Sequence, residues 1–481
     1  MSIRNDNASG GYMQPDQSSN ASMHKRDLRV EEEIKPLDDM DSKGAVAADG
    51  EVHLRKSFSL WSILGVGFGL TNSWFGISTS MVAGISSGGP MMIVYGIIIV
   101  ALISICIGTS LGELSSAYPH AGGQFWWSLK LAPPKYKRFA AYMCGSFAYA
   151  GSVFTSASTT LSVATEVVGW KNGGIAFIVG LINPAWSFSC LDCATHMAFE
   201  VEKPERVIPI AIMGTVAIGF VTSFCYVIAM FFSIQDLDAV LSSTTGAPIL
   251  DIYNQALGNK SGAIFLGCLI LFTSFGCVIA CHTWQARLCW SFARDNGLPL
   301  SRLWSQVNPH TGVPLNAHLM SCAWITLIGL LYLASSTAFQ SLITGCIAFL
   351  LLSYIIPVIC LLAKKRNIAH GPFWLGKFGF FSNIVLLGWT VFSVVFFSFP
   401  PVLPVTKDNM NYVCVVIVGY TAYSILYWKY KGKKEFHALE ESENEQAEYS
   451  NNFDTIEDSR EFSVAASDVE LENEHVPWGK K

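Results

Sequence analysis

Ten apolar runs, each long enough to cross a lipid bilayer as a helix, constrain the fold of this chain more than any other feature. They lie at about 58–85, 91–115, 138–169, 173–198, 208–233, 262–286, 315–335, 339–363, 379–399 and 411–428. About 20 predominantly apolar residues span the hydrocarbon core of a membrane. Only 14% of the residues are charged, against roughly 25% in soluble domains. The sequence therefore predicts an all-α integral membrane protein.

Basic residues alternate between the connections of these runs. The second, fourth, sixth and eighth connections carry several Lys or Arg residues, whereas the connections between them carry one or none. Basic loops face the cytosol, so we predict that both termini are cytosolic. We expect polar, disordered tails at residues 1–56 and 431–481 around a transmembrane domain at 57–430. The tails are either plain solvated segments or targets of regulatory modification.

The sequence gives little sign of catalytic or metal-binding chemistry. Cys190 and Cys193 have C-x-x-C spacing, but no second such pair or His pair accompanies them. The nearest approach to a catalytic constellation is the pair His196 and Glu200, and no further ligand stands beside it. We expect no enzymatic activity, no metal, no cofactor and no nucleic-acid partner.

Glycines and polar residues interrupt the first run at its centre. The stretch GVGFGLTNSWFG, residues 65–76, contains Gly67 and Gly69, followed by Thr71, Asn72 and Ser73. Glycine weakens a helix, and Thr, Asn and Ser cap the start of a new one. A helix that restarts at mid-membrane directs free N–H groups and the positive end of its dipole at a cavity. Close packing through small residues is the alternative explanation.

The run at 173–198 is interrupted as well. We place this interruption at Asn183 and Pro184, because proline removes a backbone donor and clashes with the preceding turn. Ser187 is available to bond the backbone groups that are freed. Two interrupted runs are the best sequence indicator of a transporter's substrate site at mid-membrane.

Two kinds of substrate fit such a site. A zwitterion would rest its carboxylate on the amides of residues 71–73, and the absence of Lys and Arg inside the runs favours it. A quaternary ammonium such as choline needs an aromatic wall, for which Trp74, Trp186 and Phe188 are candidates. Aromatic side chains in membrane helices more often pack or face lipid, so each of the three has that second explanation.

Few ionisable residues lie inside the runs, and each is a functional candidate. Asp192, His196 and Glu200 share one helical face at spacings of four. Asp192 either contacts a substrate cation, relays a proton or bonds a helix end. Glu113, at the inner end of the second run, is either structural or proton-coupling. The candidates for coupling or gating are Glu113, His196 and Glu200, and those for substrate binding are Gly67, Gly69, Thr71, Asn72, Ser73, Trp74, Asn183, Trp186, Ser187, Phe188 and Asp192.

Several ordered motifs carry a family resemblance. The runs SLGELSSAYPHAGGQFWW, DCATHMAFEVEKPERVIP and HTWQARLCWSFARDNGLP resemble fungal permeases of the amino acid–polyamine–organocation superfamily, in particular the GABA, choline and related amino-acid permeases. The resemblance covers residues 57–436. It implies a LeuT-like inverted-repeat fold with interrupted first and sixth helices, whose binding segments fall on 67–76 and 183–192.

The resemblance also implies a function. It predicts secondary transport, usually proton-coupled, of an amino acid or small amine such as GABA, across the plasma membrane or an endomembrane. The alternatives are a choline or quaternary-amine permease, or a truncated isoform that does not transport.

The chain departs from this family in its number of runs. The family has twelve, and the shortage lies where Gly169 is followed by Trp170: the third run is followed by the equivalent of the sixth. Loss of a pair preserves the orientation of every later helix. We therefore predict a chain that inserts but transports poorly as a monomer, unless self-association or a full-length partner supplies the missing walls. The alternative is a mis-spliced or mis-annotated product.

Overall fold

The computed structural model describes residues 58–161, 172–241, 248–400, 403–407 and 409–436. The predicted N-terminal tail lies outside the described residues, as does most of the C-terminal one. The described chain continues in helical form beyond the predicted boundary at 430, and Phe436 is fully buried. Its ring packs against Tyr142 and Phe292, and its carbonyl oxygen accepts from Arg138. These contacts join residue 436 to the helices of the bundle.

Helices account for the described elements, and the β-pairing among them is one isolated bridge between Phe58 and Val201. The α-helices are α2 (Leu60–Thr71), α3 (Ser73–Ala117), α4 (Gln124–Leu131), α5 (Lys137–Leu161), α6 (Gly173–Gly180), α7 (Ile182–Ser187), α8 (Pro204–Ser233), α9 (Leu237–Leu241), α10 (Pro248–Leu257), α11 (Lys260–Arg294), α12 (Ser301–Trp304), α13 (Leu315–Ala334), α14 (Ser336–Ala363), α15 (Lys377–Phe396), α16 (Val413–Tyr427) and α17 (Lys433–Glu435). The 3₁₀ helix η2 (Cys193–Glu200) follows α7, and the π-helical turn η3 (Trp428–Gly432) follows α16.

All ten predicted runs contain helices in the described residues. Six helices are long and apolar enough to cross a membrane, and α6 with α7, and α13, are shorter apolar helices. The long helix α3 contains the end of the first run and all of the second. Gly89, with φ 76° and ψ −178°, separates them just before Pro90, because glycine adopts a positive φ at little cost.

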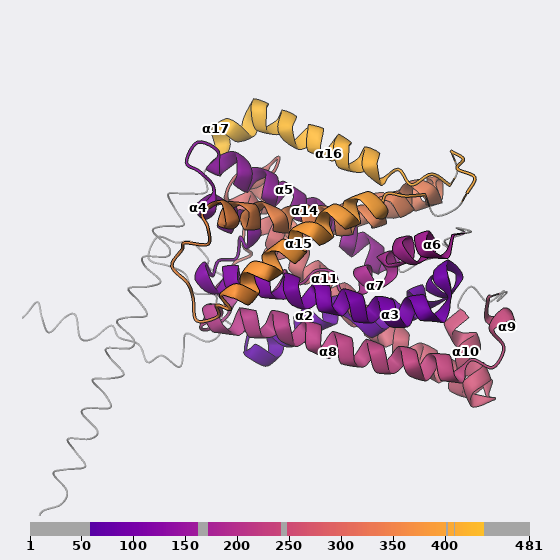
Figure 1. Cartoon of the computed structure of the whole chain (residues 1–481). Coiled ribbons are helices and arrows are strands. Elements are labelled where there is room, and N and C mark those ends of the chain that lie inside the picture. Colours follow the sequence, from indigo (N-terminus) through magenta and orange to yellow (C-terminus); the bar gives the residue numbers. More distant parts are fainter. Residues whose placement is uncertain (1–57, 162–171, 242–247, 401–402, 408, 437–481) are drawn as a thin grey trace, which may run out of the picture.

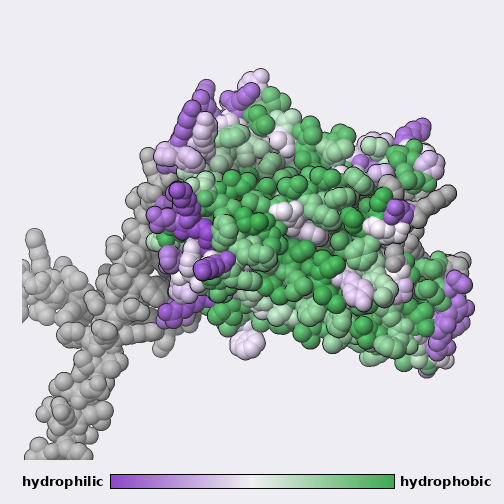
Figure 2. Space-filling view, viewed as in Figure 1, coloured by the Kyte–Doolittle hydropathy of each residue, from purple (hydrophilic) through white to green (hydrophobic). Residues whose placement is uncertain are grey.

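The long helices lie side by side, so that the chain forms a bundle with two ends (Figure 1). One end carries α4 and α17, and the other carries α9 and α10. We call them the α4 end and the α10 end. Hydrophobic residues cover the middle of the face in Figure 2, and hydrophilic residues gather toward both ends. This is the surface expected of a protein whose waist lies in hydrocarbon. The structure thus confirms the predicted all-α membrane fold.

Candidate substrate site at two interrupted helices

The first interruption consists of a single residue. Helix α2 ends at Thr71, Asn72 has left-handed angles of φ 31° and ψ 55°, and α3 begins at Ser73. Asparagine tolerates this conformation better than other residues with a side chain. The N–H of Asn72 still donates to the carbonyl of Phe68 at 2.7 Å, so the chain changes direction without losing that bond. The predicted division into two half-helices is present.

Two buried polar atoms at this interruption lack a hydrogen-bond partner among the described residues: Oδ1 of Asn72 and Oγ of Ser73. The amide nitrogen of Asn72 donates to the carbonyl oxygen of Thr273 in α11 at 3.3 Å. Buried polar atoms are nearly always hydrogen-bonded, and an exception calls for an explanation. Atoms that bind a ligand provide one.

The run at 173–198 is interrupted at two places. Helix α6 ends at Gly180 and α7 begins at Ile182, so the chain breaks at Leu181. This break lies close to the predicted position at Asn183 and Pro184, because proline supplies no N–H to the preceding turn. A longer break follows Ser187, where residues 188–192 are non-helical before η2 begins, and we call this longer break the second interruption. Cys190 has a positive φ of 64°. Ser187 donates to the carbonyl oxygen of Asn183 at 3.1 Å, as a serine in a last helical turn does.

The two interruptions lie against each other, and glycines make this possible. A Cβ atom on Gly76, in the first turn of α3, would lie 2.6 Å from Oγ of Ser187 and 3.1 Å from the ring of Trp186. A Cβ atom on Gly219 of α8 would lie 2.6 Å from Oγ of Ser73 and 3.6 Å from the ring of Phe188. The predicted segments therefore meet, with α8 closing one side.

The other candidate residues of the first run, Gly67, Gly69 and Thr71, lie in α2 and contact different neighbours. A Cβ atom on Gly67 would lie 2.8 Å from Oγ1 of Thr215 in α8, so this glycine allows α2 to approach α8 closely. A Cβ atom on Gly69 would lie 3.8 Å from Cβ of Ala280 in α11, which is an ordinary contact. Thr71 donates to the carbonyl oxygens of Gly67 and Phe68 at 3.2 and 3.3 Å.

The candidate aromatic wall is divided between two helices. Trp74 contacts the ring of Tyr226 in α8, whereas the indole N–H of Trp186 donates to Ser158 of α5 at 3.2 Å. An aromatic wall formed by both tryptophans remains a prediction.

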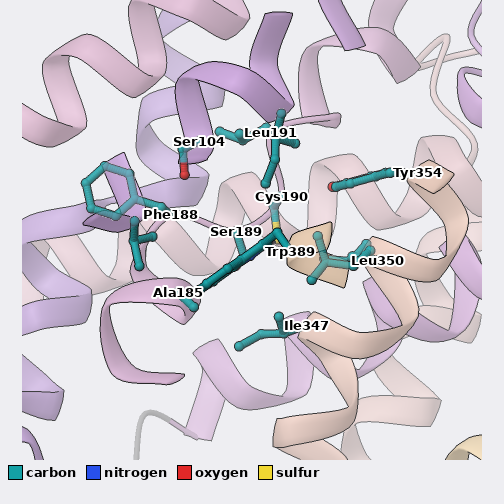
Figure 3. A pocket seen from close by; sticks show the side chains of 13 residues that line it. Ser104, Ala185, Phe188, Ser189, Cys190, Leu191, Ile347, Leu350, Tyr354 and Trp389 are labelled. Atoms are coloured by element: carbon teal, nitrogen blue, oxygen red, sulfur yellow. The ribbon is translucent and has the colours of Figure 1, made fainter. Parts of the chain in front are cut away.

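A small cavity lies beside the second interruption (Figure 3). Its volume of about 30 Å³ holds roughly two water molecules. Trp389 of α15 lies across it, and Tyr354 of α14 points into it (Figure 3). Most of the remaining lining is apolar and comes from α3, from α14 and from residues 185–191, at and after the end of α7. A substrate the size of choline requires this region to open.

Asp192 is fully buried and bonded to three other side chains. Its Oδ1 accepts from the hydroxyl of Tyr354 at 2.6 Å, and its Oδ2 accepts from the amide of Gln124 at 2.6 Å. Oδ2 also lies 3.1 Å from Nε2 of His196. Of the alternatives for Asp192, the structure displays a hydrogen-bonded network linking η2 to α4 and α14. Gln124 and Tyr354 were not predicted, since nothing in the sequence places them beside Asp192.

Glu200 and Glu113 each form a buried ion pair. Glu200 accepts two hydrogen bonds from Arg287, at 2.5 Å from Nε and 2.8 Å from the terminal nitrogen. Arg287 is 8% exposed. It lies one residue beyond the predicted run at 262–286, in the part of α11 that continues to Arg294.

The ion pair of Glu113 with Arg366 holds the connection between α14 and α15 in place. Glu113 accepts from Arg366 at 2.7 Å and from the backbone N–H of Leu375 at 2.8 Å.

At the α4 end, His120 is neutral. Burial and the nearby cations Arg294 and Lys130 lower the pKa of His120 well below its usual value. Its Nδ1 accepts from the backbone N–H of Gly122 at 2.9 Å, which a neutral ring allows. The ring stacks on Trp126 at 4.2 Å. His120 thereby fixes the short loop between α3 and α4.

Two interrupted helices packed together within an apolar bundle define a membrane transporter whose candidate site lies between discontinuous helices. The chain belongs to the amino acid permease family, whose model matches residues 58–172 and 164–420. This confirms the family that the motifs indicated.

Three relatives illustrate the similarity. The chain is 85% identical over 563 aligned positions to a choline transporter of Saccharomyces cerevisiae, with 100% of both chains covered. It is 30% identical to a 7-keto 8-aminopelargonic acid transporter of the same yeast, covering 76% of this chain and 90% of that one. It is 25% identical to an amino-acid permease of Arabidopsis thaliana, covering 80% and 93%.

The comparisons also bear on the missing helices. The 563 positions aligned with the yeast choline transporter exceed the 481 residues of this chain by 82. The two stretches that match the family model meet at residues 164–172, around the junction of Gly169 and Trp170. The first finding shows that this chain is shorter than that relative, and the second shows that the family match is divided near the predicted junction. Which helices are missing stays a prediction. The junction lies outside the described residues.

Proposed function

We propose that this protein is a secondary transporter for choline or a closely related quaternary amine. The observation that carries the proposal is the 85% identity to a choline transporter over the full length of both chains. An amino acid such as GABA is the second candidate. The buried, unpartnered hydroxyl of Ser73 at the start of α3 favours it, because helix N-termini bind carboxylates.

The proposed binding region lies where α3 begins and α7 ends. Oδ1 of Asn72 is a buried oxygen that can accept from the hydroxyl of choline or face its positive charge. Trp186 and Phe188 lie within the same contact region and offer aromatic surface to an ammonium group. The sequence predicts the same aromatic contact with an ammonium group for Trp186, Phe188 and Trp74.

We further propose that the α4 end faces the cytosol and that both termini lie there, in the plasma membrane. The basic residues Lys130, Lys135, Lys364 and Lys365 lie at or beside the α4 end, and hydrophilic residues gather there in Figure 2. Positive charge marks the cytosolic side. Coupling to protons is part of the same proposal.

Competition binding tests the substrate. The purified full-length chain is incubated with labelled choline, and unlabelled choline, tetramethylammonium or GABA is added in excess. We expect choline and tetramethylammonium to displace the label and GABA to leave it bound. No saturable binding of labelled choline, together with saturable binding of labelled GABA that unlabelled GABA displaces, would assign the site to amino acids instead.

A variant locates the site within the same assay. Asn72→Gly removes the side chain and keeps a residue that adopts a positive φ, so the backbone is retained. We expect roughly a tenfold loss of choline affinity from the lost polar contact. The control is Asn367→Ala, at an exposed loop position. Equal affinity in both variants would move the site away from the first interruption.

A further inference from the structure

The ring of His196 makes two hydrogen-bond contacts. Together they fix the number of protons that His196 and Asp192 hold as a pair. Nδ1 lies 2.8 Å from the carbonyl oxygen of Ala121, in the loop between α3 and α4. Nε2 lies 3.1 Å from Oδ2 of Asp192. The side chains of His196 and Asp192 are both 0% exposed, so water does not share these contacts.

A neutral imidazole carries only one ring proton and cannot satisfy both contacts against a carboxylate. The carbonyl oxygen of Ala121 only accepts, so Nδ1 must carry a proton to bond it. A second proton must then lie between Nε2 and Oδ2, either on His196 or on Asp192. In both cases the pair holds one proton more than a neutral imidazole and a free carboxylate hold together.

The remaining partners of Asp192 are compatible with this count. Tyr354 donates to Oδ1, and Gln124 donates to Oδ2. Oε1 of Gln124 is buried and has no hydrogen-bond partner among the described residues. The amide of Gln124 can therefore turn over and accept a hydrogen bond when the charge on Asp192 changes.

The loop at Ala121 approaches His196 so closely that a side chain does not fit between them. Gly123 has φ 52°, and a Cβ atom on it would lie 2.9 Å from Oγ1 of Thr195 and 3.0 Å from Cε1 of His196. The bond from His196 to Ala121 thus joins η2 directly to the loop at the α4 end. Losing the extra proton breaks this bond or the one to Asp192, because one ring nitrogen then faces an acceptor with a lone pair.

We propose that Asp192 and His196 form a proton-binding site, and that the bound proton clamps η2 to residues 118–123. The proton comes from water and returns to water, and no other covalent bond changes. Release of the proton frees η2 from the loop and allows the α4 end of the second interrupted segment to move. Coupling to transport rests on the proposed function, whereas the proton site itself does not.

Other titratable groups face the pair from the elements packed around it. Tyr354 comes from α14, Cys144 from α5 and His120 from the loop, and each interacts electrostatically with Asp192 or His196. Cys190 and Cys193 flank Asp192 in its own segment. Thiols and phenols ordinarily lose their proton at about pH 8.5 or above, and burial and nearby cations lower the pKa of His120 well below its usual value. The pH response is therefore assigned to the Asp192 and His196 pair.

Hydrogen–deuterium exchange of the full-length chain without ligand tests the proposal. Protection of peptides covering residues 118–123 and 193–200 is measured at pH 5.5 and pH 8.5 and corrected for the intrinsic exchange rate. We expect protection to fall roughly tenfold or more at the higher pH, as befits loss of a charge-assisted hydrogen bond. His196→Gln should remove this pH dependence. The control His310→Gln, in an exposed loop, should retain it.

A second variant distinguishes the proton site from a simple loss of contact, because it should keep the exchange protection at pH 8.5. In Asp192→Asn the new amide can donate to a neutral Nε2 of His196 and to the free oxygen of Gln124, while its own oxygen still accepts from Tyr354. We expect this variant to stay protected at pH 8.5, as the unmodified protein is at pH 5.5.

The proposal is overturned if protection in the unmodified protein is the same at both pH values. It is also overturned if His196→Gln or Asp192→Asn responds to pH as the unmodified protein does. Because no substrate is present, failure of choline binding leaves these outcomes unaffected.

Discussion

Arg287 connects two parts of the chain that sequence spacing does not bring together. Its guanidinium binds both carboxylate oxygens of Glu200, and its Cζ lies 5.5 Å from the ring centre of Phe58. The N–H of Phe58 donates to the carbonyl oxygen of Glu200 at 3.1 Å. One ion pair therefore holds together the start of the first run, the end of η2 and α11.

Removing one partner of this pair should destabilise the protein strongly. We expect Glu200→Gln to lower the free energy of unfolding by about 3 kcal/mol, because Arg287 then stays buried without a counter-charge. Thermal unfolding of the detergent-solubilised chain measures the effect. The double variant Glu200→Gln with Arg287→Gln should lose less than the sum of the two single losses.

An exposed ion pair provides the control for this experiment. Glu435 lies 3.3 Å from Lys431, and about half of each side chain is exposed. Glu435→Gln should leave the unfolding temperature unchanged, since exposed pairs contribute little. Strictly additive losses in the Glu200 and Arg287 double variant would contradict a coupled pair.

Single residues were predictable where local spacing determines the contact. Asp192 and His196 are four residues apart and are in contact. The prediction that Glu200 shares their face is wrong, because the segment is a 3₁₀ helix with three residues per turn, and Glu200 pairs with Arg287. Gln124 and Tyr354 are 68 and 162 residues from Asp192 along the chain, so only the fold brings them together. Nothing in the local sequence around a buried glutamine or tyrosine indicates which distant residue it contacts.

At the scale of elements, the contact of α3, α7 and α8 depends on small residues. Gly219 of α8 faces Ser73 and Phe188 at the two interruptions, whereas a Cβ atom on Gly276 of α11 would meet nothing within 4 Å. Both glycines lie inside long helices, so they form a matched pair for substitution.

Gly219→Ala should push α8 away from both interruptions. We expect an unfolding free energy lower by about 1–3 kcal/mol, as is usual for overpacking, together with weaker choline binding. Gly276→Ala should be neutral or slightly stabilising, because alanine favours helix and space is available. Equal stability and equal affinity in the two variants would show that the close approach at Gly219 is unimportant.

The existence of helices was easier to predict than the position of a break. Apolar length alone identified all ten runs, because hydrocarbon forces every backbone group into internal hydrogen bonds. The first interruption was predicted within the stretch 71–73 because Thr, Asn and Ser cap helix starts; Asn72 is the cap, in a left-handed conformation and without a side-chain cap bond. The second was placed at Asn183 and Pro184, and the chain breaks close by at Leu181, but the longer break after Ser187 was not predicted.

At the scale of the whole molecule, the predicted loss of two helices has the largest expected consequence. Several large apolar side chains of α11 are more than half exposed, namely Ile264, Phe265, Leu271, Phe272, Phe275 and Ile279. In a bilayer they face lipid or another transmembrane segment. Loss of a pair of helices keeps the orientation of the later ones, so we expect it to affect transport more than insertion.

We predict that the chain inserts into membranes but transports poorly as a monomer. Uptake of labelled choline is measured in proteoliposomes for this chain and for a version that carries the additional segment of the yeast relative between Gly169 and Trp170. Saturable uptake is expected only from the longer version. Robust saturable uptake by the monomeric short chain would refute the prediction, and sequencing the transcript across this junction shows whether the short form is made.

Tyr354 belongs to two neighbouring features at once: it lines the cavity beside the second interruption, and its hydroxyl bonds Asp192. A molecule that enters the cavity and displaces this hydroxyl alters how tightly Asp192 and His196 hold their proton. Thermodynamic linkage makes such an effect mutual, so the proton changes the affinity for that molecule by the same factor. A substitution that weakens this coupling for one of the two ligands therefore weakens it by the same factor for the other.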